Sequence, residues 1–258
     1  MTKILAIANQ KGGVGKTTTT VNLAACLSDL EQRVLLVDLD PQGNATMGSG
    51  LEKNDLPNSV YEVLAQGASA KKCIQRSGVA GFDLLPANGD LTAAEVELLN
   101  SDRREQRLHE ALAEVTGNYD FILIDCPPSL NMLTLNALVA ANGIIITMQC
   151  EYYALEGLSA LLNTVGKVAS SINPNLRVEG ILRTMYDPRN SLTRDVSSQL
   201  LTHFGDKVYR TVIPRNVRLA EAPSHGLPIV RYDRSSRGSA AYQALAQEIM
   251  NKLDKTAN

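Results

Sequence analysis

The sequence lacks the features that mark several classes of protein. None of its apolar runs reaches the roughly 18 residues that a membrane-spanning helix requires. The apolar run Ile4–Ala8 near the N-terminus is too short for the hydrophobic region of a secretory signal, so we expect a cytoplasmic protein. The four cysteines include no Cys-x-x-Cys pair, which argues against both a zinc knuckle and a disulfide framework.

Extremes of composition are missing too. Hydrophobic residues make up 44% of the 258 residues and charged residues 20%, both close to the usage of ordinary soluble proteins. These proportions exclude a disordered chain, a coiled coil and a collagen-like repeat. We find no internal repeat, low-complexity segment or linker, and therefore expect one domain over residues 1–258.

The net charge is only −2, but it is unevenly distributed. The segment Arg183–Arg237 contains ten basic and five acidic residues, a net charge of +5, whereas the rest of the chain carries −7. A basic region on an acidic body is typical of a protein with a polyanionic partner. A solvated surface with scattered ion pairs gives the same charge pattern, so both interpretations remain open.

Apolar runs alternate with helical patterns along the chain. The runs predicted as strands are Lys3–Asn9, Arg33–Asp38, Phe82–Pro86, Phe121–Asp125, Gly143–Met148, Arg177–Leu182 and Val208–Ile213. Helical spacing is found in Thr17–Leu30, in Leu91–Asn100, where Thr92 and Glu95 have the spacing of a capping box, and in Ala154–Ser170. Continuous Val/Ile/Leu runs favour strands covered on both faces. We therefore predict an α/β fold with a mainly parallel, twisted sheet and helices on both faces.

The strongest local signal is a glycine-rich segment that follows the first predicted strand and opens the first predicted helix. It reads Gln10-Lys11-Gly12-Gly13-Val14-Gly15-Lys16-Thr17-Thr18. Glycine adopts positive φ without strain, so we expect Gly12, Gly13 and Gly15 to turn backbone N–H groups toward phosphate oxygens at the helix N-terminus. Lys16 is placed to contact the β- and γ-phosphates, and the Thr17 hydroxyl to bind Mg²⁺. The first glycine of the G-x-x-x-x-G-K-[ST] pattern is missing, so the segment is a variant phosphate loop.

Lys11, at the start of this loop, allows two interpretations. One lysine suffices to neutralise phosphates from within a loop, so a second can simply be a solvated surface residue. It can also reach the nucleotide of a facing subunit, as an arginine finger does when it is supplied in trans. The spacing alone favours the solvated lysine.

A phosphate loop requires an acidic residue at the end of a neighbouring strand to organise Mg²⁺ and its water ligands. Asp125 and Asp38 each end a predicted strand, and Asp40 lies two residues after Asp38. Positions two apart in a strand face the same side. We therefore expect Asp38 and Asp125 to serve the metal and Asp40 to face the γ-phosphate, where it orients or deprotonates the attacking water. The scattered residues His109, His203 and His225 form no competing site.

Longer segments carry a family resemblance. Lys11–Thr18 (KGGVGKTT), Leu35–Asn44 (LLVDLDPQGN) and Ile122–Ser129 (ILIDCPPS) resemble the deviant Walker A ATPases, which implies their P-loop NTPase fold. Gln149–Leu158 (QCEYYALEGL) and Val212–Ile229 (VIPRNVRLAEAPSHGLPI) more narrowly resemble the ParA/Soj chromosome- and plasmid-partitioning ATPases. The resemblance covers nearly the whole chain. Because the sequence starts directly at the first predicted strand, it is similar to the short members, which lack an N-terminal helix-turn-helix domain.

The resemblance implies roles that spacing alone does not assign. In this family the lysine matching Lys11 crosses a nucleotide-sandwich dimer to the partner's phosphates, and the aspartate matching Asp40 is needed for hydrolysis. Asp125 matches the Walker B acid, and Pro214 and Asn216 match positions near the adenine. Lys11, Lys16 and Asp40 are then catalytic. The implied nucleotide-binding residues are Lys11, Gly12, Gly13, Val14, Gly15, Lys16, Thr17, Thr18, Pro214 and Asn216.

The resemblance also gives a role to the basic segment. Arginines matching Arg189 and Arg218 contribute to sequence-independent binding of double-stranded DNA in this family, and Arg215 is our candidate for a third. Contacts to phosphates hold a protein on the duplex without reading bases, and they weaken steeply with salt. For each arginine a surface ion pair remains the alternative.

The family's activity implies a cycle with ATP and Mg²⁺ as its cofactors. ATP closes two subunits into a homodimer, Lys11 of each subunit completes the other's site, and two half-patches of arginine join into one DNA-binding surface. Hydrolysis through Asp40 loosens the dimer, and a centromere-bound ParB/Spo0J-type partner stimulates that step through its basic N-terminal segment. We accordingly expect a weak basal ATPase in the cytoplasm, associated with the nucleoid and not with membrane.

Three other functions are considered. A MinD-like membrane-cycling ATPase uses a basic amphipathic C-terminal helix, whereas the apolar stripe in Ser239–Leu253 is more simply a helix packed on the core. An iron–sulfur protein of the nitrogenase iron-protein type needs bridging thiolates, and Cys126 is its candidate ligand here. The third is a nucleotide-gated DNA-binding scaffold that hardly hydrolyses ATP. It differs from the partitioning ATPase only in its turnover when DNA and the ParB-type partner are both present.

Overall fold

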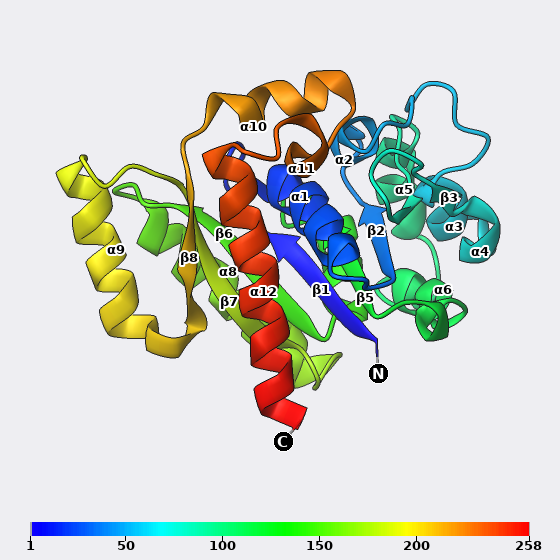
Figure 1. Ribbon diagram of the computed structural model, residues 1–258. Coiled ribbons are helices and arrows are strands. Elements are labelled where there is room, and N and C mark those ends of the chain that lie inside the picture. Colours follow the sequence, from blue (N-terminus) through cyan, green and yellow to red (C-terminus); the bar gives the residue numbers. More distant parts are fainter. Residues whose placement is uncertain (1, 258) are drawn as a thin grey trace.

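The computed structural model describes residues 2–257 and consists of a central sheet between two layers of helices (Figure 1). The strands are β1 (Lys3–Ala8), β2 (Val34–Asp38), β3 (Gln75–Arg76), β4 (Asp83–Leu85), β5 (Phe121–Asp125), β6 (Gly143–Gln149), β7 (Arg177–Tyr186) and β8 (Val208–Pro214). They form one sheet in the order β3-β4-β2-β5-β1-β6-β7-β8. All neighbouring strands are parallel except β3 and β4. The predicted fold class is confirmed.

Most strand boundaries follow the predicted apolar runs, because strands covered on both faces require apolar residues at every position. In β1, Ile4 and Ala6 belong to the hydrophobic cluster on one face of the sheet, and Leu5 and Ile7 to the cluster on the other. The prediction missed β3, whose two polar residues carry no pattern, and it ended β7 too early.

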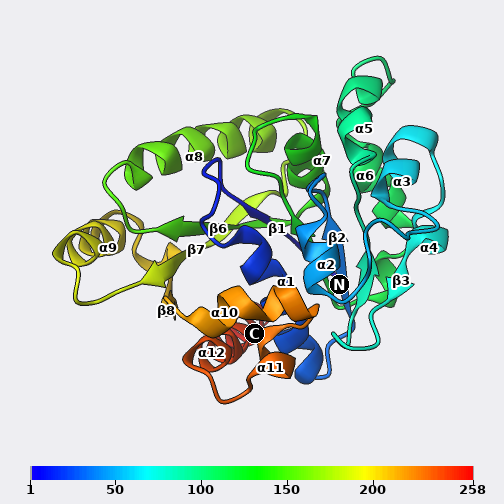
Figure 2. The ribbon, with the colours of Figure 1, turned by 90° about the horizontal axis from the view of Figure 1, so that it is seen from above.

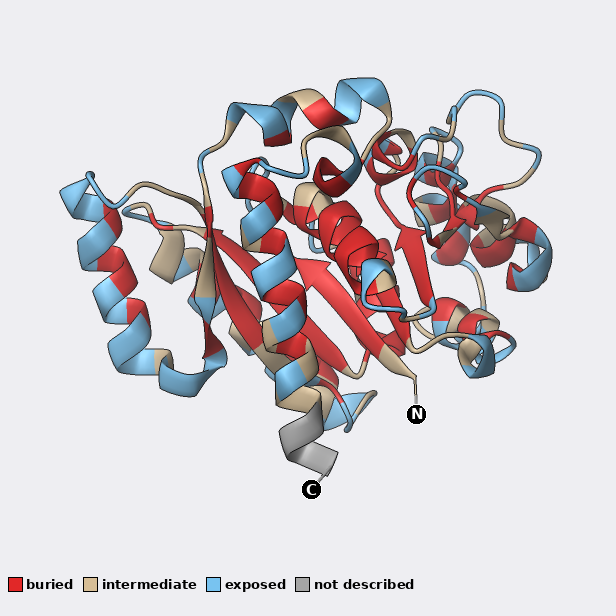
Figure 3. Cartoon of the chain, viewed as in Figure 1, coloured by how far each residue is buried: buried red, intermediate tan, exposed pale blue. Residues whose placement is uncertain are grey.

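Helices cover both faces of the sheet (Figures 1 and 2). They are α1 (Lys16–Asp29), α2 (Asn44–Gly48), α3 (Val60–Gln66), α4 (Ala70–Cys73), α5 (Leu91–Leu98), α6 (Arg107–Ala113), α7 (Met132–Ala140), α8 (Ala154–Ser171), α9 (Ser191–Phe204), α10 (Val217–Glu221), α11 (Ile229–Tyr232) and α12 (Arg237–Ala257), with 3₁₀ turns at Thr116–Asn118, Gly205–Lys207 and Ala222–His225. Viewed from above, α1, α10, α11 and α12 lie on one side of the sheet and α7 and α8 on the other (Figure 2). Figure 3 shows that the sheet between them is almost wholly buried.

The long C-terminal helix α12 packs on the core, as its apolar stripe predicts. Tyr242, Leu245 and Ile249 are buried and belong to the hydrophobic cluster that also contains residues of α1. Burying an apolar stripe of this kind is the usual source of helix stability in a globular protein. Within the part of the chain that the structure describes, no helix has the length and apolar character needed to cross a membrane.

The predicted capping box at Thr92 and Glu95 is wrong. Helix α5 begins at Leu91, so Thr92 lies inside the first turn, and the side chain of the N-cap residue Asp90 accepts no backbone N–H of the helix. A capping box exists instead at α3, where the Ser59 hydroxyl accepts a bond from the Tyr61 amide and Glu62 accepts the Ser59 amide at 2.7 Å. The spacing of threonine and glutamate alone does not determine where a helix starts.

Parallel pairing brings the carboxyl ends of the central strands to one edge of the sheet. The loop after β1, which contains the glycine-rich segment, therefore lies beside the ends of β5 and β6. Asp38 at the end of β2 is the register partner of Asp125 at the end of β5. This edge is where open α/β sheets place their ligands.

Candidate functional site

A cavity of about 740 Å³ opens at this edge, a size typical of small-molecule sites. It is lined by Gly12, Gly13, Gly15, Lys16, Thr17, Thr18, Asp40, Gln42, Asn44, Pro128, Thr184, Met185, Ile213, Pro214, Arg215, Asn216, Val217, Leu219, Ala220 and Tyr242. One end is the glycine-rich loop and the start of α1. The other end is formed by the end of β8 and by α10.

The loop has the backbone conformation that its glycines permit. Gly13 and Gly15 have φ of 72° and 83°, in the left-handed region where a side chain causes strain. Gly12 lines the cavity but does not have positive φ, so the positive φ expected at this glycine is wrong. Gly15 is the N-cap of α1 and no side chain caps that helix end, so its first N–H groups are available to an anion. The Thr184 hydroxyl donates to the Val14 carbonyl at 2.8 Å and ties the loop to β7.

Lys16 extends from the first turn of α1 into the cavity wall. It is only 6% exposed, and its Nζ donates to the Lys11 carbonyl at 3.2 Å. Burial lowers the pKa of Lys16, and the negative charge of Asp125 opposes that shift. A buried ammonium without a paired carboxylate is poised to gain from a bound polyanion.

Asp125 is completely buried, and its carboxylate faces the helix that follows the loop. Its Oδ2 accepts a hydrogen bond from the Thr17 hydroxyl at 2.7 Å, and its Oδ1 accepts one from the Thr20 hydroxyl at 3.0 Å. Burial, together with the nearby charge of Asp38, raises the pKa of Asp125 to about 8. The structure thus brings the predicted residues Thr17 and Asp125 together.

Asp38 is also fully buried, but its carboxylate faces α2. Its Oδ2 accepts bonds from the Thr46 amide and hydroxyl, both at 2.8 Å, and its Oδ1 accepts one from the Asp40 amide at 3.1 Å. Burial raises the pKa of Asp38 to about 6, partly offset by the Thr46 hydrogen bonds. Asp38 is not among the residues that line the cavity, whereas Asp40 is, with its Oδ1 accepting the Gln42 amide at 3.0 Å.

Lys11 does not line its own subunit's cavity. Its ammonium forms an ion pair with Glu151 in the loop after β6, and both side chains are about half exposed. The adjacent Tyr152 and Tyr153 are exposed and contact each other edge to face, with ring centroids 5.0 Å apart. Lys11 therefore belongs to the outer surface around the cavity and not to its interior.

Pro214, Arg215 and Asn216 lie at the other end of the cavity, where β8 leads into α10. The Asn216 side chain is the N-cap of α10 and accepts the Leu219 amide at 3.3 Å. Val217, Leu219 and Ala220 give this end apolar contacts, which suits a flat, partly apolar group. The structure places the predicted Pro214 and Asn216 in the same cavity as the phosphate loop.

Sequence reasoning missed several lining residues. Met185 has a φ of 48°, which is uncommon for a residue other than glycine and is typical of functional sites. Tyr242 comes from α12, and its hydroxyl lies 3.1 Å from that of Thr19. Gln42 and Asn44 belong to the family-like segment LLVDLDPQGN, and this membership was the only sign in the sequence that they lie at the site. Nothing near Met185 or Tyr242 in the sequence points to the cavity.

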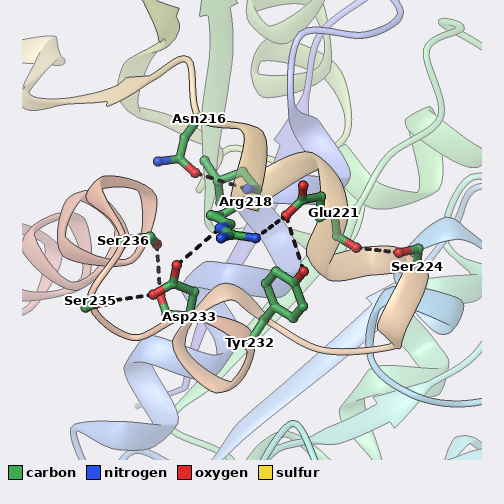
Figure 4. Close-up of polar contacts among 9 residues, drawn as sticks. Asn216, Arg218, Glu221, Ser224, Tyr232, Asp233, Ser235 and Ser236 are labelled. Atoms are coloured by element: carbon green, nitrogen blue, oxygen red, sulfur yellow. Dashed lines mark hydrogen bonds and ion pairs between the residues drawn. The ribbon is translucent and has the colours of Figure 1, made fainter.

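Arg189 and Arg218 lie outside the cavity and are ion-paired. Figure 4 shows Arg218 between Glu221 and Asp233. Its Nη1 is 2.8 Å from Glu221 Oε2, and its Nε is 3.5 Å from Asp233 Oδ2. Arg189 is 2.8 Å from Asp187 and is almost fully exposed. Among the described residues, Arg215 takes part in no ion pair, and it lines the cavity.

The thiol of Cys126 does not support an iron–sulfur site. Cys126 is fully buried, and burial raises its pKa, which disfavours the thiolate that a cluster requires. Among the residues whose side chains the structure describes, no group of three or more His, Cys, Asp or Glu is arranged to hold a metal ion by itself. The oxygen atoms of Thr17 and Asp125 can still serve a small cation that takes its other ligands from phosphate and water.

Comparisons with known proteins agree with this geometry. The model of a family described as an AAA domain matches residues 2–178. The chain is 55% identical to the sporulation initiation inhibitor protein Soj of Bacillus subtilis, over 96% of this chain and 98% of that protein. It is 48% identical to the chromosome partitioning protein ParA of Myxococcus xanthus, over 97% of this chain and 88% of that protein.

A solved structure from Mycobacterium smegmatis has the same fold. That protein, described as cobyrinic acid a,c-diamide synthase and crystallised with an ATP analogue and magnesium, superimposes with a TM-score of 0.86. The two sequences are 40% identical, over 98% of this chain and 96% of the other.

Proposed function

The chain belongs to the ParA/Soj family of partitioning ATPases, and on this premise we propose that its cavity binds ATP with Mg²⁺ and hydrolyses the nucleotide to ADP and phosphate. The observation that carries the proposal is the buried Lys16 at an uncapped helix N-terminus, beside the Thr17–Asp125 pair. These groups offer positive charge and N–H donors where the phosphates would lie.

The cavity can accommodate a whole nucleotide. The loop residues Gly12–Thr18 are proposed to hold the phosphates, and Pro214 and Asn216 to contact the base at the apolar end. Thr17 and Asp125 fit Mg²⁺, because both present hard oxygen atoms next to the phosphate position. When bound, Mg²⁺ would neutralise phosphate charge. Asp38 would act through its charge on Asp125, since its Oδ2 already accepts from Thr46 and its Oδ1 from the Asp40 amide.

Asp40 is proposed to position the attacking water. It lines the cavity near Thr17, and the bond from the Gln42 amide fixes one of its carboxylate oxygens. A carboxylate in this place can accept a hydrogen bond from water and orient it for in-line attack. Asp40 would thus act on hydrolysis while the loop provides binding.

The dimer is proposed to close over the nucleotide with Lys11 contacting the partner's phosphates. Lys11 lies outside its own cavity and is half exposed, which supports a contact in trans over one in cis. Closure would place the two arginine surfaces together. We propose that Arg189, Arg215 and Arg218 then bind the phosphates of double-stranded DNA without reading its sequence.

The wider function proposed is chromosome or plasmid partitioning as a single ATPase domain over residues 1–258. A ParB-type centromere-binding partner would stimulate hydrolysis and so release the DNA. The MinD-like alternative receives no support from α12, whose apolar stripe is buried against the core. Binding of the protein to liposomes in the presence of ATP would revive it.

Light scattering after size exclusion tests the proposed function. Asp40→Ala is run without nucleotide, with ADP and with ATP–Mg²⁺, and each run is repeated with a non-specific duplex. Of the three nucleotide conditions, we expect only ATP–Mg²⁺ to give a dimer, and to give a dimer–DNA complex when duplex is present. A protein that remains monomeric when saturated with ATP would contradict the sandwich dimer. Turnover measured with duplex and ParB-type partner together then distinguishes an ATPase from a static scaffold.

A further inference from the structure

Arg218 is held by two carboxylates from different parts of the chain. Glu221 is at the last residue of α10, one turn from Arg218, and Asp233 follows α11. Figure 4 shows the guanidinium between them, with its Nη1 and Nε directed at the two acids. The hydrogen bond from Arg218 to Glu221 raises the pKa of the arginine. The three side chains together carry a net charge of −1, so Arg218 presents no excess positive charge.

Other polar groups fix both acids in place. The Tyr232 hydroxyl donates to Glu221 Oε2 at 3.2 Å, and the Ser235 hydroxyl donates to Asp233 Oδ1 at 2.9 Å. The Ser236 hydroxyl donates to the Asp233 carbonyl at 2.8 Å and accepts the Ser239 amide at the start of α12. These bonds lower the entropy cost of pairing, because the acids are already ordered when the arginine meets them.

Arg189 has the same kind of partner. Its Nε and Nη2 donate to the two carboxylate oxygens of Asp187 at 2.9 and 2.8 Å, in the planar fork that arginine also uses for phosphate. Within the described chain, Arg215 is in contrast free of ion pairs. Two of the three arginines proposed to bind DNA are thus occupied by acids of the same subunit.

We propose that Glu221, Asp233 and Asp187 are intramolecular counter-ions that duplex phosphates must displace before Arg218 and Arg189 can bind DNA. The inference rests on the proposed function, which assigns these arginines to the DNA interface. Carboxylate and phosphate compete for the same guanidinium N–H donors, so each new phosphate contact is offset by a lost ion pair. One subunit then binds duplex weakly, and two joined surfaces are needed for stable binding.

The salt dependence of DNA affinity distinguishes arginines with intramolecular counter-ions from a surface with a simple excess of positive charge. Salt weakens phosphate contacts, but it also weakens the competing ion pairs, because these pairs are exposed and screened. Neutralising the acids therefore removes the carboxylates that compete with DNA phosphate for the arginines. This competition is strongest at low salt, where the ion pairs are least screened. The gain in DNA affinity should shrink as the salt concentration rises.

The test measures affinity for a fluorescent non-specific duplex by anisotropy, in the Asp40→Ala protein with ATP–Mg²⁺. Glu221→Gln and Asp233→Asn keep the shape of each side chain and remove its charge. We expect the double variant to bind roughly three- to tenfold more tightly at low salt, and Asp187→Asn to add about twofold, as exposed ion pairs of this kind suggest. At high salt the variants should approach the unmodified protein.

Two controls isolate the counter-ion effect. Asp120→Asn makes the same charge change in the Arg33–Asp120 ion pair, at the amino ends of β2 and β5, opposite the cavity edge. Tyr232→Phe removes the bond that orients Glu221 and leaves every charge in place. Neither should tighten DNA binding by more than about twofold. Thermal melts and light scattering establish that each variant is folded and dimeric.

The outcomes separate the inference from the proposed function. If the neutralised variants bind DNA as the unmodified protein does, or if Asp120→Asn tightens binding equally, the counter-ion role is refuted while DNA binding stands. If Asp233→Asn alone gives a salt-dependent gain, the role is supported even where Glu221→Gln unfolds α10. If the dimer binds no duplex at any salt concentration, the DNA-binding function fails and the counter-ion role fails with it.

Discussion

Two regions of the molecule use the same residue types in opposite ways. Around the phosphate loop, Lys16, Asp38 and Asp125 are each less than a tenth exposed and are bonded mainly to hydroxyl and backbone groups. Beside α10, Arg218 and its acids are exposed or half-buried and pair with one another. Buried charges depend on a fixed surrounding, and exposed pairs exchange partners at small cost. The first region is built for one ligand, whereas the second can change its partner.

The largest expected effect tests the buried region. Lys16→Ala should lower ATP affinity by roughly 1,000-fold or more, because it removes a desolvated charge aimed at the phosphates. Isothermal titration calorimetry measures this loss. The matched change Lys11→Ala should leave ATP affinity of the monomer within about threefold, because Lys11 does not line its own cavity. Equal losses of ATP affinity in both variants would contradict the different roles proposed for Lys16 and Lys11.

Asp40→Ala should separate binding from hydrolysis. We expect turnover to fall by about 100- to 1,000-fold, the range typical of a lost general base or water-positioning group. ATP affinity should change by no more than a few-fold, because Asp40 touches neither the loop backbone nor Lys16 through a hydrogen bond. Phosphate release measures turnover, and a nucleotide-binding assay provides the comparison. Unchanged turnover would remove Asp40 from the mechanism.

A pH series tests the buried carboxylates in the absence of nucleotide and metal. The pKa of Asp125 is raised by burial to about 8, so the folded state prefers the protonated acid. The stability from this preference is fully present below about pH 4 and is lost as pH rises through about 8. Asp125→Asn should therefore be the more stable protein at pH 8, by on the order of 2 kcal/mol, in thermal or denaturant unfolding. Parallel pH profiles for the two proteins would contradict the shift.

The last prediction concerns the exposed region. Replacing both Arg189 and Arg218 by glutamate should lower DNA affinity about 10- to 100-fold at low salt and flatten its salt dependence. ATP binding and dimer formation should persist, because neither residue lines the cavity. Electrophoretic shifts at two salt concentrations measure the change. Unchanged shifts at low salt would mean that DNA binds elsewhere.

The regular part of the fold was predictable because its signals are local. Continuous apolar runs identified the parallel strands, and glycines between a strand and a helix identified the phosphate loop. Short or weakly patterned elements could not be predicted, as β3 and the wrong capping box at Thr92 show. Spacing fixes periodicity, but the exact residue at which a helix begins depends on tertiary contacts.

The site was only partly predictable for a related reason. Asp38, Asp40 and Asp125 could all be placed at one sheet edge, yet the sequence did not show that the Asp38 carboxylate faces Thr46. Met185 and Tyr242 reach the cavity from β7 and α12, so only the folded chain brings them to the glycine loop. The partners of Arg218 likewise come from two separate segments.

The shortness of α10 has a mechanical consequence. Its five residues span only about 8 Å, and Leu219 and Ala220 line the cavity while their neighbour Arg218 does not. If the cavity holds a base and Arg218 contacts a duplex, as proposed, the two contacts lie within one turn of the same helix, and a tilt of α10 would move both.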